Sequence, residues 1–520
     1  MTFPRKIAIV LLLLVLFSAL GQLYDLQLPT LRWFFSFEFD SSSEGSRINW
    51  SVITGYALLT LVTVIAIGCW IAGKNFEWNP MTARRFKRFR SLSRGYRSFI
   101  ILVVILLTTI PDQALVGKKA LAVKYNGSWY FPAFVTKNYT DDAFGGVPKQ
   151  NANYREIKKR FQAEKKGNFA IMPIVPWDTT FDTDELQKVS LANRDGVYYE
   201  QNSNKAYQGL ATSYFPNSPT IQQKESTFRK GKLQGSTTVF SDKGEPLAKE
   251  TWREGVLEKR EIYDKSADET QFSGPSDYYA LKYPPVAPSW KNHHILGTDS
   301  RGWDLFAQLY GGLQVVCKAS AFYVFLTFAI GIVTGLASGY FGGVFDLIMQ
   351  RMIEILSNIP FLFVVMIIAS RIGRENVSII SIVAVMSIFS WIGISLYKRT
   401  AAYKEKARDY VAAARVLGAG TPRIIFRHIL PNVLSTSITL VPFTVTAVAT
   451  SLTSLDFIGF GLPDRYPSWG TLLADGLANL EAPWIVSSVF VILAVTLLLI
   501  TFVGEAIREA FDPKKFTTYS

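Results

Sequence analysis

The sequence predicts an all-α membrane protein with about eight transmembrane helices and an inserted extracytoplasmic domain that contains a small β-rich repeat. Three observations support this fold class. The 520-residue chain is 49% hydrophobic, and its apolar residues are gathered into runs near the roughly 20-residue length that crosses a bilayer. Lys and Arg cluster at the ends of these runs. One long polar stretch with glycine turns lies between two of the runs.

The predicted transmembrane segments cover about 7–23, 51–73, 98–116, 313–338, 350–370, 377–397, 433–455 and 485–504. The first segment poses a choice, because Arg5 and Lys6 precede an apolar run that ends at small residues, as in a secretory signal. We favour a retained helix, since Leu20 and Leu23 weaken the small-residue cleavage pattern. A cleaved signal stays the alternative.

Charge predicts the orientation. Eight Lys and Arg residues against the single acid Glu77 lie between the second and third segments, and the 398–432 loop is also basic. Short basic loops stay in the cytoplasm. An even number of segments separates the two loops, so we expect both termini in the cytoplasm and residues 117–312 outside. The net charge of +14 is thus explained without nucleic acid, because the basic residues mark segment ends rather than one face of a soluble fold.

The outer region 117–312 contains a weak internal repeat. Residues 228–232 (Phe-Arg-Lys-Gly-Lys) are similar to 252–256 (Trp-Arg-Glu-Gly-Val), with glycine turns between short strands. The pattern resembles the MORN-type β-hairpin repeats of YwqK-like proteins. We place the insertion at about 178–275, as a sheet that contacts a partner or the cell wall, or as a solvated insertion tolerated in a loop. The two cysteines, Cys69 and Cys317, fall in different transmembrane segments and predict no disulfide framework.

Between the sixth and seventh segments the sequence predicts a short helix-turn-helix. Asp409 begins a helix of small residues that Gly418 can end, and Pro422 can occupy the first turn of a second helix. That second helix is expected to stop before Pro431, because proline lacks the N–H that a helix interior needs. An element rich in small and basic residues can fit a groove on a soluble partner; an ordinary cytosolic hairpin is the plainer interpretation.

This segment resembles the EAA loop of ABC importer permeases, which docks into the ATPase subunit. Ala413, Ala414, Gly418, Leu430 and Pro431 match the family spacing. Ala412 stands where the family often has Glu, and His428 where it often has Ile. The resemblance implies that loop 405–432 receives the ATPase. The implied ATPase-coupling residues are Ala413, Ala414, Gly418, His428, Leu430 and Pro431.

Residues 294–304 resemble the segment before the core of dipeptide and oligopeptide permeases, with Trp303 where that family commonly has Arg. Asp299 and Asp304 can cap a helix that begins near Leu305, a structural role that we favour over ligand contact. The segment 294–304 is itself expected to form an amphipathic helix at the outer membrane surface, just before the 313–338 segment. Further motifs are similar to C-type permeases of peptide and microcin C importers; they lie at 126–132, 137–146, 450–463, 467–470, 479–484 and 504–513.

The resemblance covers about 85–175 and 284–515 and implies a type I ABC importer permease core in the bacterial inner membrane. The implied organisation is an N-terminal extension with a basic cytosolic loop (1–97), a first family-type helix (98–116), the periplasmic domain (117–312), the core (313–505) and a cytosolic tail (506–520). The implied partners are a second permease, two ATP-binding subunits, a periplasmic binding protein and a peptide substrate. ATPase closure would move loop 405–432 and switch the permeases between inward and outward access.

No enzyme signature is found in the sequence. It lacks a phosphate-binding GxxxxGK[ST] loop, so ATP hydrolysis is expected in other chains, and we predict no catalytic residue, cofactor or metal site. His293 and His294 are expected in a solvated turn, and Glu354 beside Arg351 reads as a structural pair rather than a proton relay. A membrane-anchored sensor or scaffold that uses the outer domain is the main rival function, and a secondary transporter is a third.

Overall fold

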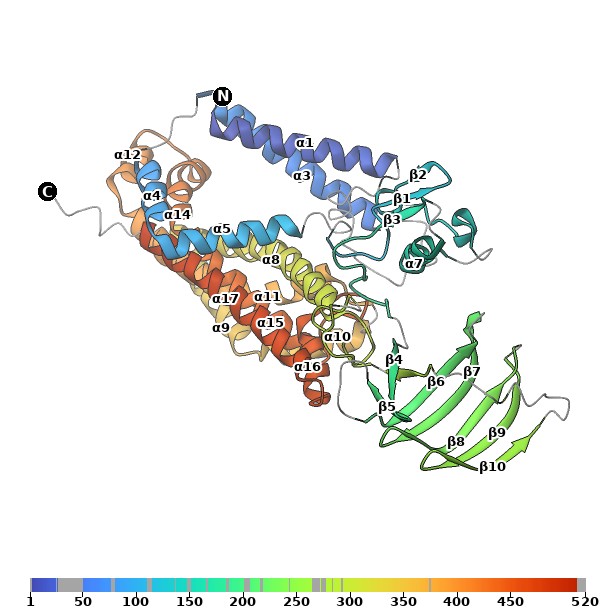
Figure 1. Ribbon diagram of the computed structural model, residues 1–520. Coiled ribbons are helices and arrows are strands. Elements are labelled where there is room, and N and C mark those ends of the chain that lie inside the picture. The colour runs from blue at the N-terminus through green and yellow to red at the C-terminus, as the bar shows by residue number, and fades with distance from the viewer. Residues whose placement is uncertain are drawn as a thin grey trace. The chain divides into compact units, whose positions relative to one another are not determined.

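Figure 1 shows the computed structural model of the chain, which divides into two compact units. The first unit comprises Met1–Asp182, Ala287–Asp299 and Trp303–Ser520, and the second comprises Thr183–Val286 with Ser300–Gly302. The structure describes residues 2–24, 26, 50–75, 80–109, 115–135, 137–146, 151–164, 167–183, 187–200, 206–215, 218–242, 244–263, 272, 277–282, 284–290, 293–373 and 376–511. Most of the predicted tail 506–520 lies outside these residues.

The first unit is built mainly of helices (Figure 1). The long ones are α1 (Phe3–Leu23), α3 (Trp50–Ala72), α5 (Ser93–Thr108), α8 (Leu305–Phe341), α11 (Ile379–Lys406), α15 (Val441–Phe457) and α17 (Pro483–Phe511). The shorter ones are α4 (Pro80–Ser91), α7 (Tyr154–Glu164), α9 (Gly343–Ser357), α10 (Phe361–Ile372), α12 (Asp409–Val416), α13 (Thr421–Arg423), a π-helical segment Ile424–Ile429, α14 (Leu430–Ser437) and α16 (Trp469–Ala478).

The predicted class, a helical membrane protein with a β-rich insertion, is confirmed. Among the described residues, five helices are long and apolar enough to cross a membrane, or up to seven if each of two bent pairs is one span. Seven of the eight predicted segments correspond to these helices and bent pairs. The remaining one, 433–455, is divided between α14 and the 17-residue α15.

Two other predicted segments differ in shape. The 350–370 segment is not one straight helix, because the chain bends by 73° between α9 and α10, where Pro360 interrupts the hydrogen-bonding ladder. Conversely, α8 runs unbroken for 37 residues from Leu305. The expected surface helix at 294–304 is wrong, because these residues form turns and isolated bridges before α8 begins.

Small residues allow α8 and α11 to pack closely. Gly331, Gly335 and Gly339 repeat every fourth residue along one face of α8. A Cβ added at Gly335 would lie 2.4 Å from the carbonyl oxygen of Ser395 in α11, and one at Gly339 would lie 2.5 Å from that of Arg399. Helices in a bilayer gain stability from such close backbone contact, since lipid offers no hydrophobic driving force. These two helices are therefore packed closely against each other along this face.

A small sheet and one helix form the outer part of the first unit. Strand β1 (Ala122–Tyr125) lies between β2 (Ser128–Tyr130) and β3 (Phe169–Ile171), and all pairings are antiparallel. One face of this sheet packs on α7, where Val123 and Ala170 contact Ile157 and Phe161 in a buried aromatic cluster. The tight turn at Asn126-Gly127 has positive φ at both residues.

The second unit is one curved antiparallel sheet, drawn in green in Figure 1. Its strands are β4 (Gln187–Arg194), β5 (Val197–Glu200), β6 (Gly209–Phe215), β7 (Ser218–Arg229), β8 (Lys232–Phe240), β9 (Pro246–Arg253), β10 (Val256–Ile262) and β11 (Tyr279–Lys282), in the order β10-β9-β8-β7-β6-β11-β4-β5.

The predicted glycine turns join these strands into hairpins. Lys230-Gly231 and Glu254-Gly255 have positive φ at both residues, as two-residue hairpin turns require. A third turn of the same kind, Asp195-Gly196, joins β4 to β5. The repeat found in the sequence did not include it.

Candidate coupling element and the polar network before α8

The residues after α11 fold into a compact element, 405–437, that begins as the sequence predicts. Helix α12 ends at Val416, and Gly418 follows two residues later with a φ of +77°, which suits glycine. The N–H of Gly418 donates to the carbonyl of Arg415 and that of Ala419 to Ala414, both at 3.0 Å. Pro422 then occupies the first turn of α13, where its missing N–H costs nothing.

The predicted stop before Pro431 is wrong. The chain continues from α13 through the π-helical segment Ile424–Ile429 into α14, and Pro431 lies in the first turn of α14. At the changeover the N–H of Leu430 donates to the carbonyl of Ile425, five residues earlier. A π turn widens the helix and shifts its hydrogen-bond pairing, so the missing N–H of Pro431 falls where the pattern is already interrupted.

One side of the element is buried against the long helices. Val411 of α12 and Ile424 and Ile429 of the π segment are each about 1% exposed. They share one apolar cluster with Leu336 and Tyr340 of α8, Ala402 of α11 and Val433 of α14. Because side chains at close-packed density transmit displacement, force applied to this element reaches α8 and α11 directly.

The other side of the element exposes apolar side chains. Val416 is 88% exposed and Leu417 is 86% exposed, at the end of α12 beside Gly418, and Phe426 of the π segment is also exposed. A Cβ at Gly418 would meet no atom within 4 Å, so the space beside the turn is open. Exposed apolar residues gathered on a basic loop indicate a contact surface for another protein.

The structure divides the predicted coupling residues between these two sides. Ala413, Gly418 and Pro431 are exposed, whereas Ala414 is buried. His428 and Leu430 are half-buried, and Leu430 packs against the buried cluster. The sequence did not single out Val416 and Leu417, although two apolar residues directly before a turn in a basic loop were a readable signal.

Polar contacts also fasten the element to the long helices. The buried Lys398 of α11 donates from Nζ to the carbonyl of Val433 at 3.0 Å and to Oγ1 of Thr436 at 3.2 Å. Lys406 donates from Nζ to the carbonyl of Tyr340 in α8 at 2.6 Å. These lysines donate to carbonyls of other helices, so they fix the element more firmly than apolar packing alone would.

A carboxylate links α9 to the same end of α11. Asp346 accepts two hydrogen bonds of 2.6 Å from the guanidinium of Arg399 and one of 2.7 Å from the hydroxyl of Tyr403. Such a bidentate pair is strong and directional. The partners are 53 and 57 residues apart, and nothing in the sequence predicted the contact.

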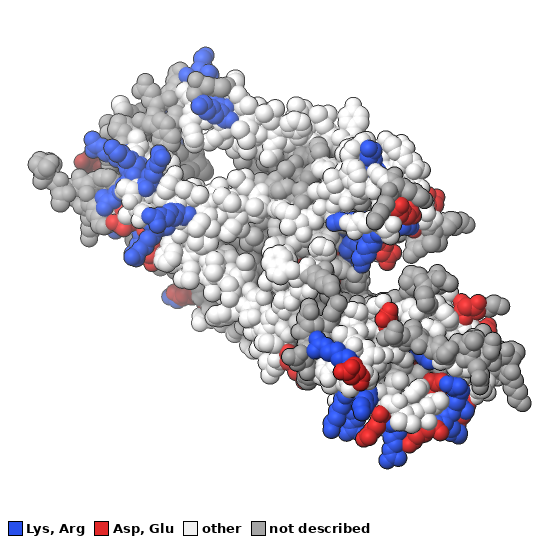
Figure 2. Space-filling view, viewed as in Figure 1, with Lys and Arg blue, Asp and Glu red and all other residues white. Residues whose placement is uncertain are grey.

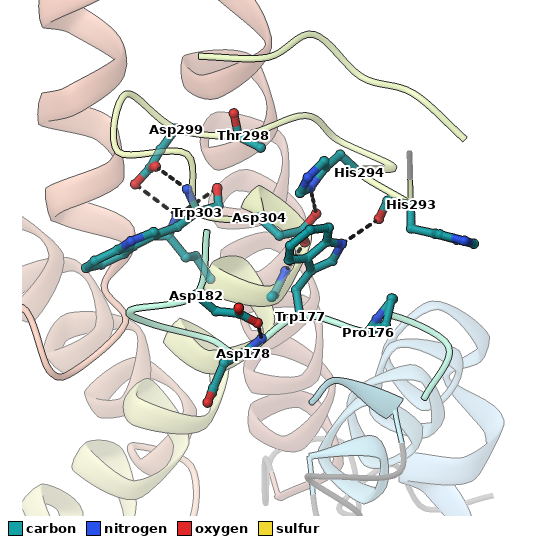
Figure 3. Close-up of polar contacts among 12 residues, drawn as sticks. Pro176, Trp177, Asp178, Asp182, His293, His294, Thr298, Asp299, Trp303 and Asp304 are labelled. Carbon is teal, nitrogen blue, oxygen red and sulfur yellow. Dashed lines mark hydrogen bonds and ion pairs between the residues drawn. The ribbon is translucent and has the colours of Figure 1, made fainter. Parts of the chain in front are cut away.

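A second polar group surrounds the start of α8 (Figure 3). Asp304 caps the helix as predicted, because its Oδ1 accepts from the N–H of Ala307 at 2.8 Å. Asp299 accepts from the N–H of Trp303 at 2.8 Å and from the amide of Gln308 at 3.0 Å. Both carboxylates are fully buried.

The expectation of a solvated histidine turn is half wrong. His293 is exposed with a positive φ of 59°, as in a turn, but His294 is only 1% exposed. Nδ1 of His294 lies 2.8 Å from Oδ2 of Asp304 (Figure 3). Its burial could not be predicted, because Trp177, which stacks on its ring with centroids 4.1 Å apart, lies more than a hundred residues away.

The stack continues through Trp177 to a charged pair. The guanidinium of Arg155 lies 4.0 Å from the centre of the Trp177 ring and makes two hydrogen bonds of 2.8 Å to Asp182. Burial tends to raise the pKa of Asp182. Hydrogen bonds and charge from Arg155, the N–H of Asp178 and the charge of Lys118 outweigh burial and hold this pKa below its ordinary value. The network joins α7 and the loop after it to the start of α8.

Another buried carboxylate explains the motifs near the C-terminal end. Asp456 of α15 accepts from the N–H of Leu462 at 2.6 Å and from the hydroxyl of Ser468. A Cβ at Gly461 would lie 1.7 Å from this carboxylate, and one at Gly470 would lie 2.1 Å from the carbonyl of Thr453. The glycines and the acid of this segment therefore hold a tight turn between α15 and α16.

Charge is distributed unevenly over the helical unit. Figure 2 shows Lys and Arg gathered where α4 and α12 lie, while the surface over α5, α8 and α17 is almost uncharged. Helix α4 packs on the end of α17, where Phe89 contacts Ala506 and Ala510. Within the described ranges no group of three His, Cys, Asp or Glu side chains is placed to hold a metal ion.

Comparison with known proteins gives consistent similarities. Residues 331–517 match the family described as binding-protein-dependent transport system inner membrane component. The chain is 29% identical over 437 residues to the inner membrane ABC transporter permease protein YejE of Escherichia coli, covering 84% of this chain and 98% of that protein. It is 29% identical to the peptidoglycan transport system permease protein YejE of Agrobacterium fabrum, covering 84% and 94%.

A shorter relative matches this chain over most of the relative's own length. The oligopeptide transport system permease protein OppC of Haemophilus influenzae is 34% identical over 230 residues, which are 44% of this chain and 73% of that protein. These similarities confirm the resemblance to dipeptide and oligopeptide permeases that the sequence motifs indicated.

Proposed function

Since the chain belongs to the family of binding-protein-dependent transport system inner membrane components, we propose that it is the transmembrane permease subunit of an ATP-driven importer of peptides or peptide-like compounds. It pairs with a second permease, two ATP-binding subunits and a periplasmic substrate-binding protein. Relatives named as peptidoglycan, oligopeptide and dipeptide permeases support a peptide-like substrate.

The observation that carries the proposal is the two-sided form of element 405–437. Its inner side is packed and hydrogen-bonded to α8 and α11, while Val416 and Leu417 project from its outer side. An ATPase groove that receives this outer side moves the element when ATP closes the two ATPases. Because the inner side cannot slide freely, the movement rotates α8 and α11 and opens the path to the other side of the membrane. A sensor or scaffold has no use for this linkage.

The orientation proposed from the basic loops places α4 and the coupling element in the cytoplasm, with both termini, and residues 117–312 outside. Both basic regions lie at the same end of the helical unit in Figure 2, which supports this assignment.

Cysteines introduced at Arg90 and Gly244, after Cys69 and Cys317 are replaced, test this orientation. We expect Arg90→Cys to react with an impermeant maleimide only from the cytoplasm and Gly244→Cys only from outside; the reverse at either position contradicts the proposed orientation.

A matched pair of variants at Gly418 tests the coupling role. Asn and Asp both tolerate positive φ and have nearly the same size, so Gly418→Asn and Gly418→Asp impose a similar backbone cost. Only Asp adds a negative charge beside Val416 and Leu417. We expect Gly418→Asp to reach the membrane and to lose uptake and ATPase copurification, while Gly418→Asn retains a larger part of both.

Uptake is measured with a labelled peptide in cells, and assembly by copurification with a tagged chain. Normal ATP-driven uptake by Gly418→Asp would show that this turn does not contact the ATPase. Equal loss in both variants would assign the defect to backbone strain instead of the contact.

A further inference from the structure

The small outer sheet β2-β1-β3 has an apolar outer face that its packing does not explain. Its inner face covers α7, so the outer face should carry polar side chains. Instead, four large apolar side chains are exposed there: Trp129 at 51%, Phe131 at 47%, Phe169 at 40% and Ile171 at 47%. A contiguous exposed patch of this kind marks an interaction surface.

Strand register places these side chains together around one lysine. Lys124 of β1 lies directly opposite Trp129 in β2 and opposite Phe169 in β3, so the three form a row across the sheet. The Trp129 ring stacks on Phe131 with centroids 6.3 Å apart and meets Phe169 edge-on at 5.5 Å. Lys124 is half-buried, with its ammonium 5.9 Å from the Trp129 ring. We call these residues, with Ile171, the aromatic face.

The aromatic face is tied at both edges to segments next to membrane helices. On the β2 side, Val135 pairs with Leu26, which lies three residues beyond the end of α1 at Leu23. On the β3 side, Val175 pairs with Val116, which follows α5. Phe131 and Val135 are four positions apart in the chain, as are Ile171 and Val175, a stretch that spans at most about 14 Å.

The composition of the aromatic face suits the boundary between lipid and water. Trp is enriched at that boundary, where its ring lies among the headgroups. A lysine in the middle buries its aliphatic stem against the rings and presents its ammonium to lipid phosphates. A protein-binding patch of the same size would need a partner that reaches a surface held this close to the span ends.

From these observations we propose that the aromatic face inserts into the headgroup region of the outer leaflet and anchors the outer part of the first unit to the membrane. The occupant is phospholipid, bound by the rings and by Lys124. The anchor holds α7 and the Trp177–His294 network at a fixed height above the start of α8. This inference depends on α1 and α5 crossing the membrane and is independent of the coupling proposal.

The test uses the full-length chain, with the subunits that copurify with it, in vesicles of phosphatidylethanolamine and phosphatidylglycerol. After Cys69 and Cys317 are replaced by Ser, a bimane dye is attached at Trp129→Cys or, in a second variant, at Ile171→Cys on the opposite edge. The control is Glu156→Cys, an exposed site on α7, which packs on the opposite face of the same sheet. Doxyl groups at acyl carbon 5 or 12 quench from the lipid, and iodide quenches from water.

We expect blue-shifted emission and strong quenching by the shallow doxyl group at 129 and 171, weaker quenching by the deep one, and several-fold less lipid quenching at 156. Quenching by iodide alone at 129 and 171 would overturn the proposal. Protection from iodide without lipid quenching would also overturn it, in favour of a protein partner on this face. Agreement between the two labelled edges guards against a local effect of losing Trp129.

Discussion

At the residue scale, the Arg155–Asp182 pair makes a sharp stability prediction. The folded-state pKa of Asp182 is lowered, so its ionised form stabilises the fold. This contribution is fully present above the unfolded value of about 4 and is lost as pH falls through the lower folded value. We expect Asp182→Asn to destabilise the outer part of the first unit by about 3 kcal/mol at pH 7, because it leaves the guanidinium with a poorer partner.

Hydrogen exchange of the α7 amides, corrected for intrinsic rates, measures this cost. The difference between wild type and Asp182→Asn should shrink as pH is lowered below about 4. The matched control is Glu156→Gln, an exposed carboxylate on the same helix, which should change little. A difference that stays constant from pH 7 to below 4 would mean that the carboxylate charge is not what stabilises this region.

The same scale shows where prediction from sequence ends. The cap at Asp304 was predictable, because it depends on residues within three positions of it. The burial of His294 and the Asp346–Arg399 pair were not, because their partners come from distant segments. Contacts between neighbouring residues follow from the local sequence, whereas contacts between distant residues depend on how whole helices pack.

At the element scale, the packing of α8 on α11 depends on glycine at particular positions. A side chain at Gly335 meets backbone atoms of Ser395 and the Cβ of Lys398, at 2.4 and 2.8 Å, which cannot rotate away. We expect Gly335→Leu to force the helices apart and cost about 1–3 kcal/mol or more. The thermal stability of the detergent-solubilised chain, followed by size-exclusion chromatography, measures the loss.

Gly393 in α11 is the matched control. No atom lies within 4 Å of a Cβ added there, so Gly393→Ala should be tolerated and can stabilise the helix by up to about 1 kcal/mol. Equal thermal stability of Gly335→Leu and the wild type would show that α8 and α11 are not in close contact. The glycine spacing was readable in the sequence, but only the structure distinguishes Gly335 from Gly393.

At the π-helical segment, the rule that proline ends a helix gave the wrong prediction. Proline disfavours a helix interior, and from sequence that predicted an end before Pro431. The chain avoids the conflict by shifting its pairing over Ile424–Ile429. The residue types at 424–429 give no separate signal for a π turn, since one extra residue in the hydrogen-bonding ladder changes no composition.

At the scale of the whole molecule, the β-rich unit should be separable from the transport core. Strands β4 and β11 are adjacent, and Gln187 pairs with Lys282, so the chain enters and leaves this sheet at neighbouring positions. A short linker can therefore join the two ends. The insertion estimated from sequence at about 178–275 stops short of β11, which pairs with β4 and β6. A deletion that ended near residue 275 would leave β11 without its sheet.

We therefore expect that replacing residues 184–285 with a short Gly/Ser linker yields a chain that still inserts into the membrane and still retains the ATPase. The Arg155–Asp182 pair and the Asp304 cap lie outside the deleted residues, so the first unit keeps the contacts that hold α7 to α8. Loop closure also depends only weakly on length. Uptake can fall in this variant if the sheet contacts the binding protein, so assembly is the quantity that decides.

The measurement is copurification of the ATPase with the tagged deletion variant, beside Gly418→Asp as a control that reaches the membrane without docking. Degradation of the deletion variant, or loss of the ATPase from it, would mean that the sheet is part of the structural core of the permease.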